Sequence, residues 1–101
     1  MENIKGTELD ELKIQGEKLL IDYWAPWCMP CKSLIPRLEK IESEYPDVKF
    51  VKINVDENSD HAMNVGIRSV PTVMFFDGEN IVDISIGVKA DDYYKTLLKS
   101  L

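Results

Sequence analysis

The stretch from residue 19 to residue 55 changes twice between strand-type and helix-type hydrophobic patterns, and this restricts the fold more than any other feature. Residues 19–25 are apolar except for Asp22, which is typical of a strand covered on both faces of a sheet. Residues 49–55 alternate apolar with polar side chains and are rich in β-branched residues, which predicts another strand. Between them, from Cys28 onward, apolar residues recur at steps of four and three and form one stripe along a helix. The sequence therefore predicts a β-α-β unit with parallel strands.

Shorter elements are expected on both sides of this unit. A helix over residues 7–14 precedes it, and any strand before residue 7 would be very short. The elements expected after it are a short helix from Asn58 or Ser59 to Val65, a strand over residues 72–76, a returning strand with Val82, Ile84 and Ile86 on one face, and a final helix with Asp91 near its start. Asp77 and Gly78 mark the hairpin turn between the last two strands. This order predicts an α/β fold.

The length and charge of the chain limit its organisation and its partners. A chain of 101 residues with 45% hydrophobic residues fits one domain over residues 1–101. Its net charge of -6 opposes contact with a phosphate backbone, so nucleic acid is not an expected partner. The N-terminus lacks the basic start and apolar stretch of a signal peptide, and no run approaches the ~20 residues that span a membrane. We therefore expect a cytoplasmic protein that has no membrane partner.

Cys28 and Cys31 are the only cysteines, and they lie at the start of the predicted central helix. A reducing compartment keeps ordinary thiols reduced, so a close pair there points to catalysis or to metal binding. Because two cysteines supply only half of a zinc site, we expect no metal. A buried pair of small apolar side chains and half of a metal site are the other interpretations of such a pair.

The spacing of the two cysteines suits reversible disulfide chemistry. Residues three apart on a helix share a face, so the two sulfurs can approach disulfide geometry. The helix N-terminus favours the thiolate of Cys28, which makes this residue the expected nucleophile. Cys31 lies one turn further in and is the expected resolving thiol. Pro30 in the first turn lacks an N–H where its loss costs least, and it stiffens the site.

Two charged residues in the predicted strands extend this site. Asp22 lies in a buried strand, six residues before Cys28, and burial should raise its pKa. It is therefore a plausible proton acceptor for Cys31 during turnover. Lys52 lies in the middle of the neighbouring strand, where the two charges are best tolerated if they face each other directly or through water. The alternative for Lys52 is an edge-strand lysine that points to solvent.

Three other side chains have weaker signals. Trp27 is expected to cover the thiols, and Met29 between the cysteines is expected to be exposed and to touch bound partners. His61 belongs to a polar helix start, where a solvated side chain is the usual outcome, so we assign it no role.

The residues around the cysteines resemble a known family. Residues 24–32 are similar to the active-site stretch of the thioredoxin family, and the resemblance continues over nearly the whole chain. The other matching positions are Asp22, residues 52–56, residues 66–72 and Gly87. Met29 departs from the pattern, because thioredoxins usually have glycine there.

This resemblance implies a fold and a binding surface. The implied fold is the thioredoxin fold, a central mixed β-sheet of four to five strands flanked by four helices. It implies a cis peptide bond before Pro71 that brings Val70 beside the cysteines, where the main chain of Val70 pairs with an extended segment of the substrate. The implied substrate-binding residues are Trp27, Met29, Pro30, Val70, Pro71 and Gly87.

The resemblance also implies an activity. A thioredoxin is a protein-disulfide reductase that carries electrons from a flavin-containing thioredoxin reductase to disulfide-containing target proteins. It needs no bound cofactor of its own, and we expect a monomer. Pro30 favours a reductant, since oxidising relatives carry histidine beside the second cysteine.

Two other functions are compatible with the same sequence. One is a thioredoxin-fold binding module whose cysteines matter little, although the presence of both thiols and of Asp22 argues against it. The other is a dedicated partner of one reductase or one peroxidase, which Met29 supports. The sequence does not separate a generalist from such a specialist.

Overall fold

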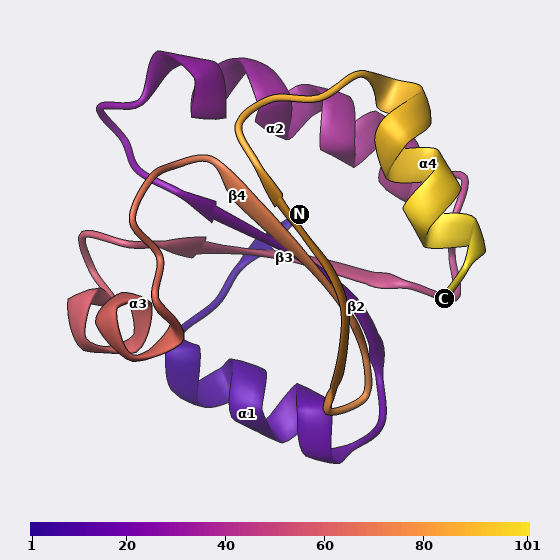
Figure 1. The fold of residues 1–101 in the computed structure, drawn as a ribbon, viewed down its shortest axis with the longest axis horizontal. Coiled ribbons are helices and arrows are strands. Elements are labelled where there is room, and N and C mark those ends of the chain that lie inside the picture. The colour runs from indigo at the N-terminus through magenta and orange to yellow at the C-terminus, as the bar shows by residue number, and fades with distance from the viewer.

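The structure is a computed structural model that describes residues 1–101 and contains five strands and four helices (Figure 1). In chain order the elements are β1 (Glu2–Asn3), α1 (Gly6–Ile14), β2 (Lys18–Trp24), α2 (Met29–Glu42), β3 (Lys49–Asn54), α3 (Ser59–Val65), β4 (Thr72–Asp77), β5 (Asn80–Ile86) and α4 (Asp91–Lys99). This is the predicted order with the short strand β1 at its start. The helix and strand boundaries differ from the predicted ones by one or two residues.

The five strands form one mixed sheet in the order β1-β3-β2-β4-β5. Strands β1, β3 and β2 run parallel, whereas β4 runs antiparallel to β2 and β5 runs antiparallel to β4. The parallel pairing of β2 with β3 confirms the predicted β-α-β unit. Because β2 is the central strand, its carboxyl end and the loop after it lie in the middle of one edge of the sheet.

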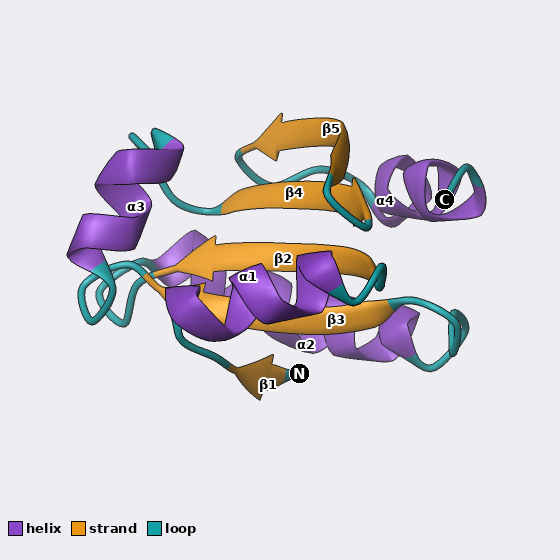
Figure 2. Ribbon diagram, turned by 90° about the horizontal axis from the view of Figure 1, so that it is seen from below, coloured by secondary structure: helices purple, strands orange, loops and turns teal.

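Helices cover both faces of this sheet, with α2 and α4 on one face and α1 and α3 on the other (Figures 1 and 2). On the first face, Leu34 and Leu38 of α2 and Tyr94 of α4 pack on the sheet in a cluster of 10 buried residues. On the second face, Leu9 of α1 belongs to a cluster of 9 buried residues. Both faces of β2 are therefore covered, as its almost continuous apolar run predicts.

Strand β5 lies at one edge of the sheet, and the two-residue strand β1 lies at the other (Figure 2). Val82, Ile84 and Ile86 of this strand are exposed to 41%, 46% and 62%. The sequence pattern predicts that they share a face, but this face of an edge strand is only partly covered by the rest of the chain. The chain thus keeps an apolar surface outside its core.

None of the helices is both long enough and apolar enough to cross a membrane.

Candidate functional site

Cys28 and Cys31 form a disulfide at the start of α2. Their Cα atoms are 5.3 Å apart, within the usual range for a disulfide. Cys31 is fully buried, whereas Cys28 keeps 5% of its surface exposed. The two cysteines form the disulfide that their spacing predicts, and Cys28 is slightly more exposed than Cys31.

The start of α2 places a main-chain donor against Cys28. Cys28 is the N-cap residue of the helix, and its Sγ accepts a hydrogen bond from the main-chain N–H of Cys31 at 3.2 Å. Pro30 follows in the first turn, where the helix has no partner for an N–H group. A negative charge on this sulfur is stabilised by the N–H group and by the positive end of the helix dipole.

The loop before β4 lies against the same sulfur. The carbonyl oxygen of Val70 is 3.7 Å from Sγ of Cys28, and the peptide bond between Val70 and Pro71 is cis. The N–H of Gly87, which has a φ of +82°, donates to the carbonyl oxygen of Pro71 at 2.9 Å. Val70 therefore contacts Cys28 directly, and Gly87 anchors the loop that carries Val70.

Asp22 lies on β2 with no solvent exposure, and neither of its carboxylate oxygens has a hydrogen-bond partner. Burial raises the pKa of its carboxyl to about 7, and the positive charge of Lys52 opposes part of this rise. An unpartnered carboxyl in an apolar core favours its neutral form, because the charge has nothing to solvate it. Asp22 can therefore gain or lose a proton near neutral pH.

Lys52 is the neighbour of Asp22 across the pair β2–β3. Its Nζ lies 5.0 Å from the centre of the Trp24 ring, a cation–π distance. The two side chains do not form a direct ion pair, since both oxygens of Asp22 lack a partner. Lys52 thus acts on Asp22 through its charge.

Trp27 and Met29 project from the surface on either side of Cys28, with exposures of 68% and 69%. The indole Nε1 of Trp27 donates to Oδ2 of Asp56 at 3.0 Å. A pocket of 110 Å³ is lined by Trp27, Val55 and the loop from Ile67 to Val70. The bond from Trp27 to Asp56 has no signal in the sequence, because neither residue belongs to a pattern that pairs them.

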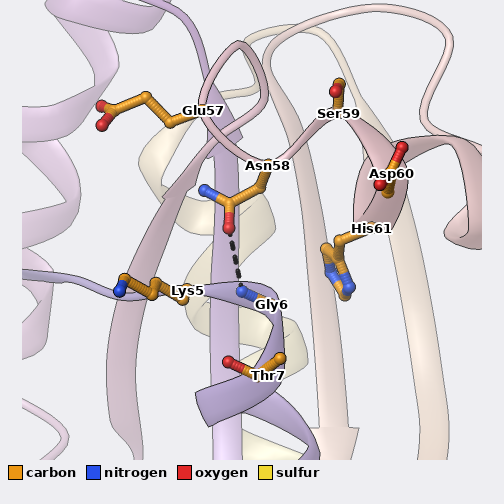
Figure 3. Close-up of a pocket in the computed structure, with 8 residues that line it drawn as sticks. All are labelled: Lys5, Gly6, Thr7, Glu57, Asn58, Ser59, Asp60 and His61. Carbon is orange, nitrogen blue, oxygen red and sulfur yellow. Dashed lines mark hydrogen bonds between the residues drawn. The ribbon is translucent and has the colours of Figure 1, made fainter.

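The largest pocket, of 280 Å³, lies elsewhere, between the starts of α1 and α3 (Figure 3). Oδ1 of Asn58 accepts a hydrogen bond from the N–H of Gly6 at 3.1 Å, so its side chain ties the two helices together and does not cap α3. The residues that line this pocket include neither cysteine and no hydrophobic side chain. This pocket is therefore separate from the disulfide.

His61 belongs to this second region, and its side chain is half-buried rather than fully solvated as predicted. Its Nε2 forms a hydrogen bond of 2.9 Å with the hydroxyl of buried Tyr23, and the two rings are stacked. Burial lowers the pKa of His61. The buried tyrosine hydroxyl needs a polar partner. The sequence of α3 alone does not predict this bond, because Tyr23 lies on another element.

Comparison with known proteins agrees with this geometry. A family model described as Thioredoxin matches residues 4–100. A thioredoxin of Synechocystis is 47% identical over 70 residues, 68% of this chain and 65% of that protein, and one of Mycoplasmoides gallisepticum is 39% identical over 93 residues, 92% of this chain and 93% of that protein. The chain thus spans 65% of the length of the cyanobacterial relative.

Solved structures give the same result over the full length. Oxidised mitochondrial thioredoxin 3 of Saccharomyces cerevisiae superimposes with a TM-score of 0.90 at 34% identity, over 100% of this chain and 95% of that one. A thioredoxin of Plasmodium falciparum has a TM-score of 0.89 at 30% identity, over 99% and 98%. The predicted mixed sheet flanked by four helices is confirmed. With the disulfide at the start of α2, these matches show that the chain belongs to the thioredoxin family.

Proposed function

We propose that this chain is a protein-disulfide reductase that works by thiol–disulfide exchange between Cys28 and Cys31 and its targets. The observation that carries the proposal is the disulfide itself, in which Cys31 is fully buried and Cys28 keeps 5% of its surface exposed. A structural disulfide does not need this asymmetry, whereas an exchange cycle needs an accessible attacking thiol and a protected resolving thiol.

The cycle begins with the reduced form. The thiolate of Cys28 attacks one sulfur of a target disulfide, which breaks that S–S bond, forms a mixed disulfide and releases the other target sulfur as a thiolate. The thiolate of Cys31 then attacks Sγ of Cys28, which forms the Cys28–Cys31 disulfide and releases the second target sulfur. Two electrons pass to the target, and both target thiolates can take up protons.

Asp22 is the proposed proton acceptor for Cys31 in the second step. A base is most effective when its pKa is close to the working pH, and burial gives Asp22 a pKa of about 7. Lys52, beside it in register, keeps this value from rising further. We therefore assign Asp22 the proton transfer and Lys52 the adjustment of its pKa.

Targets are proposed to bind across the loop before β4. The main chain of Val70, 3.7 Å from the sulfur, offers hydrogen bonds to an extended target segment, as in strand addition. The expected contact residues around it are Trp27, Met29, Pro30, Pro71 and Gly87. Main-chain recognition places few demands on the target sequence, so many disulfide proteins can bind.

The oxidised form must be reduced again before the next cycle. We propose a flavin-containing thioredoxin reductase as the donor, with no cofactor held by this chain, and a monomer in the cytoplasm as the working state. Family membership supports the choice of electron donor, and two cysteines suffice for the exchange without a bound cofactor.

The test is reduction of insulin disulfides with dithiothreitol as the electron donor. The protein should accelerate precipitation of the insulin B chain, and Cys28→Ser should abolish this activity. Cys31→Ser should attack targets without resolving them and should trap mixed disulfides. Activity that survives Cys28→Ser would reject the mechanism, and an inactive wild type would favour a binding module.

Met29 supports a second candidate, a carrier dedicated to one reductase or one peroxidase. Its side chain is 69% exposed beside Cys28, so any partner that reaches the sulfur must accommodate it. One similar solved structure, with a TM-score of 0.91 at 33% identity, concerns the thiol resolving mechanism of a yeast mitochondrial 1-Cys peroxiredoxin. Partners trapped by Cys31→Ser separate the two candidates, because a dedicated carrier yields one major adduct.

A further inference from the structure

An apolar groove lies beside the loop that leads to Val70. We call it the strand groove: Val65, Ile67, Ile84 and Ile86 form its walls, Met74 lies in it and Arg68 is at its rim. Its volume is 190 Å³. Met74 is buried, whereas Val65, Ile84 and Ile86 are 36%, 46% and 62% exposed. Apolar side chains of three elements thus surround a hollow that no part of this chain fills.

The strand groove continues the surface around the disulfide. The loop from Ile67 to Ser69 lines both this groove and the pocket beside Trp27, so it forms one wall of each. At the other end of the groove, Ile86 precedes Gly87, whose N–H binds Pro71. The strand groove and the pocket next to Val70 are therefore neighbours that share the segment from Ile67 to Ser69.

The charge of Arg68 indicates which kind of ligand the strand groove can bind. Arg68 is exposed and forms no ion pair with this chain, although the protein carries 18 acidic residues. An unpaired guanidinium at the rim can bind a carboxylate of a ligand, while the apolar groove takes up a neighbouring apolar side chain of the same ligand.

Pairing of β5 with a second copy of the chain is disfavoured by its own sequence. Oδ1 of Asp83 accepts a hydrogen bond from the main-chain N–H of Ile84 at 2.7 Å. This uses a main-chain donor of the edge strand and places a negative charge beside it, and charges on an edge oppose edge-to-edge pairing. The apolar side chains, rather than the main chain, are therefore what this edge offers.

We propose that the strand groove binds an apolar side chain in the segment of a target protein that flanks its disulfide, with an acidic residue of the same segment at Arg68. This inference rests on the proposed function, since it assigns a sequence preference to targets of the same disulfide. Main-chain pairing at Val70 allows many targets to bind, and the strand groove makes the rate of reduction depend on the sequence beside the target disulfide.

The test uses synthetic peptides with one cysteine held as a mixed disulfide with 2-nitro-5-thiobenzoate in a serine and glycine background. Attack by Cys28 on the peptide sulfur releases a coloured thiolate, whose absorbance gives the rate. One leucine is moved through each position from three to eight residues on either side of the cysteine. We expect one or two positions to raise kcat/KM about fivefold over the peptide without leucine, which corresponds to about 1 kcal/mol of buried apolar surface.

Variants then locate the effect on the protein. Val65→Thr keeps the size of the side chain but adds a hydroxyl, and Ile84→Thr adds a hydroxyl and also shortens the side chain. Each should remove most of the leucine effect, measured as the ratio of rates with and without leucine. The matched control is Ile14→Thr, an exposed isoleucine (74%) at the end of α1, which should leave this ratio unchanged. Glutamate placed beside the leucine should add about twofold at low salt, and Arg68→Gln should remove this gain.

The outcomes separate this inference from the proposed function. Equal rates for all leucine positions, with the leucine-free peptide still reduced, would overturn the strand groove and leave the reductase intact. A leucine effect that survives both groove variants would also overturn it. If no peptide is reduced, the proposed exchange activity itself fails.

Discussion

Asp22 and Lys52 are opposite each other on adjacent strands, yet neither carboxylate oxygen of Asp22 accepts a hydrogen bond. The lysine charge therefore reaches the carboxyl across a gap instead of through an ion pair. A carboxyl held in this way costs stability when it is charged, because burial removes its water and nothing replaces it.

The first prediction concerns stability of the disulfide form. The pKa of Asp22 is raised from 3.8 to about 7, so the folded state loses stability as pH rises through that range. Asp22→Asn removes the ionisation at similar size, so its stability relative to wild type should increase by about 2 to 3 kcal/mol between pH 5 and pH 8. Urea unfolding at both pH values measures this, and a difference that does not change with pH contradicts it.

The second prediction concerns catalysis. Asp22→Ala should slow insulin reduction near pH 7 by about tenfold or more, because Cys31 loses its proton acceptor. The rate of the wild type should rise with pH through about 7, where Asp22 becomes the charged base, and this step in the profile should vanish in the variant. A variant with an unchanged rate and profile would dismiss the proton-transfer role.

The third prediction isolates Lys52. Since its positive charge lowers the pKa of Asp22, Lys52→Met should raise that pKa above its wild-type value. Carbon NMR of the labelled Asp22 carboxyl follows the titration directly. Lys49→Met, an exposed lysine on the same strand, is the control and should leave the titration in place. If both variants behave alike, the charge of Lys52 does not act on Asp22.

The fourth prediction concerns His61, far from the disulfide. Burial lowers its pKa, and the charge of Asp10 opposes this while that of Lys13 adds to it. A histidine with a lowered pKa stabilises the fold above about pH 6.5, the unfolded value, and this contribution is lost as pH falls through its folded pKa. His61→Phe keeps a ring against Tyr23 but cannot titrate, so its stability should fall less than that of wild type between pH 7 and pH 5. Parallel losses in thermal unfolding would contradict this.

The sequence predicted the Cys28–Cys31 disulfide because the residues that form it are neighbours in the chain. Cys28, Pro30 and Cys31 lie within one turn of one helix, so their spacing alone defines their geometry. Asp22 was also visible, since a single acid in an apolar strand is an anomaly in any context.

The features that the sequence did not predict join distant segments. The bond from Trp27 to Asp56 spans 29 residues and that from Tyr23 to His61 spans 38, and neither follows a periodic pattern. The side chain of Asn58 suits an N-cap of α3, but it bonds to Gly6 on another helix. The local sequence indicates which residues can accept a hydrogen bond, whereas tertiary packing determines which donor lies next to them.

The antiparallel pairing of β2 with β4 unites the two parts of the exchange site. The cysteines follow the end of β2, and the carbonyl of Val70 precedes the start of β4. The cysteines and the Val70 carbonyl come from different segments, so neither segment holds a complete site. A molecule in which β2 and β4 separate keeps its thiols but no longer has the Val70 main chain beside them to bind a protein target. Reduction of a protein disulfide, compared with that of a small reagent, can therefore report how much of a sample is correctly folded.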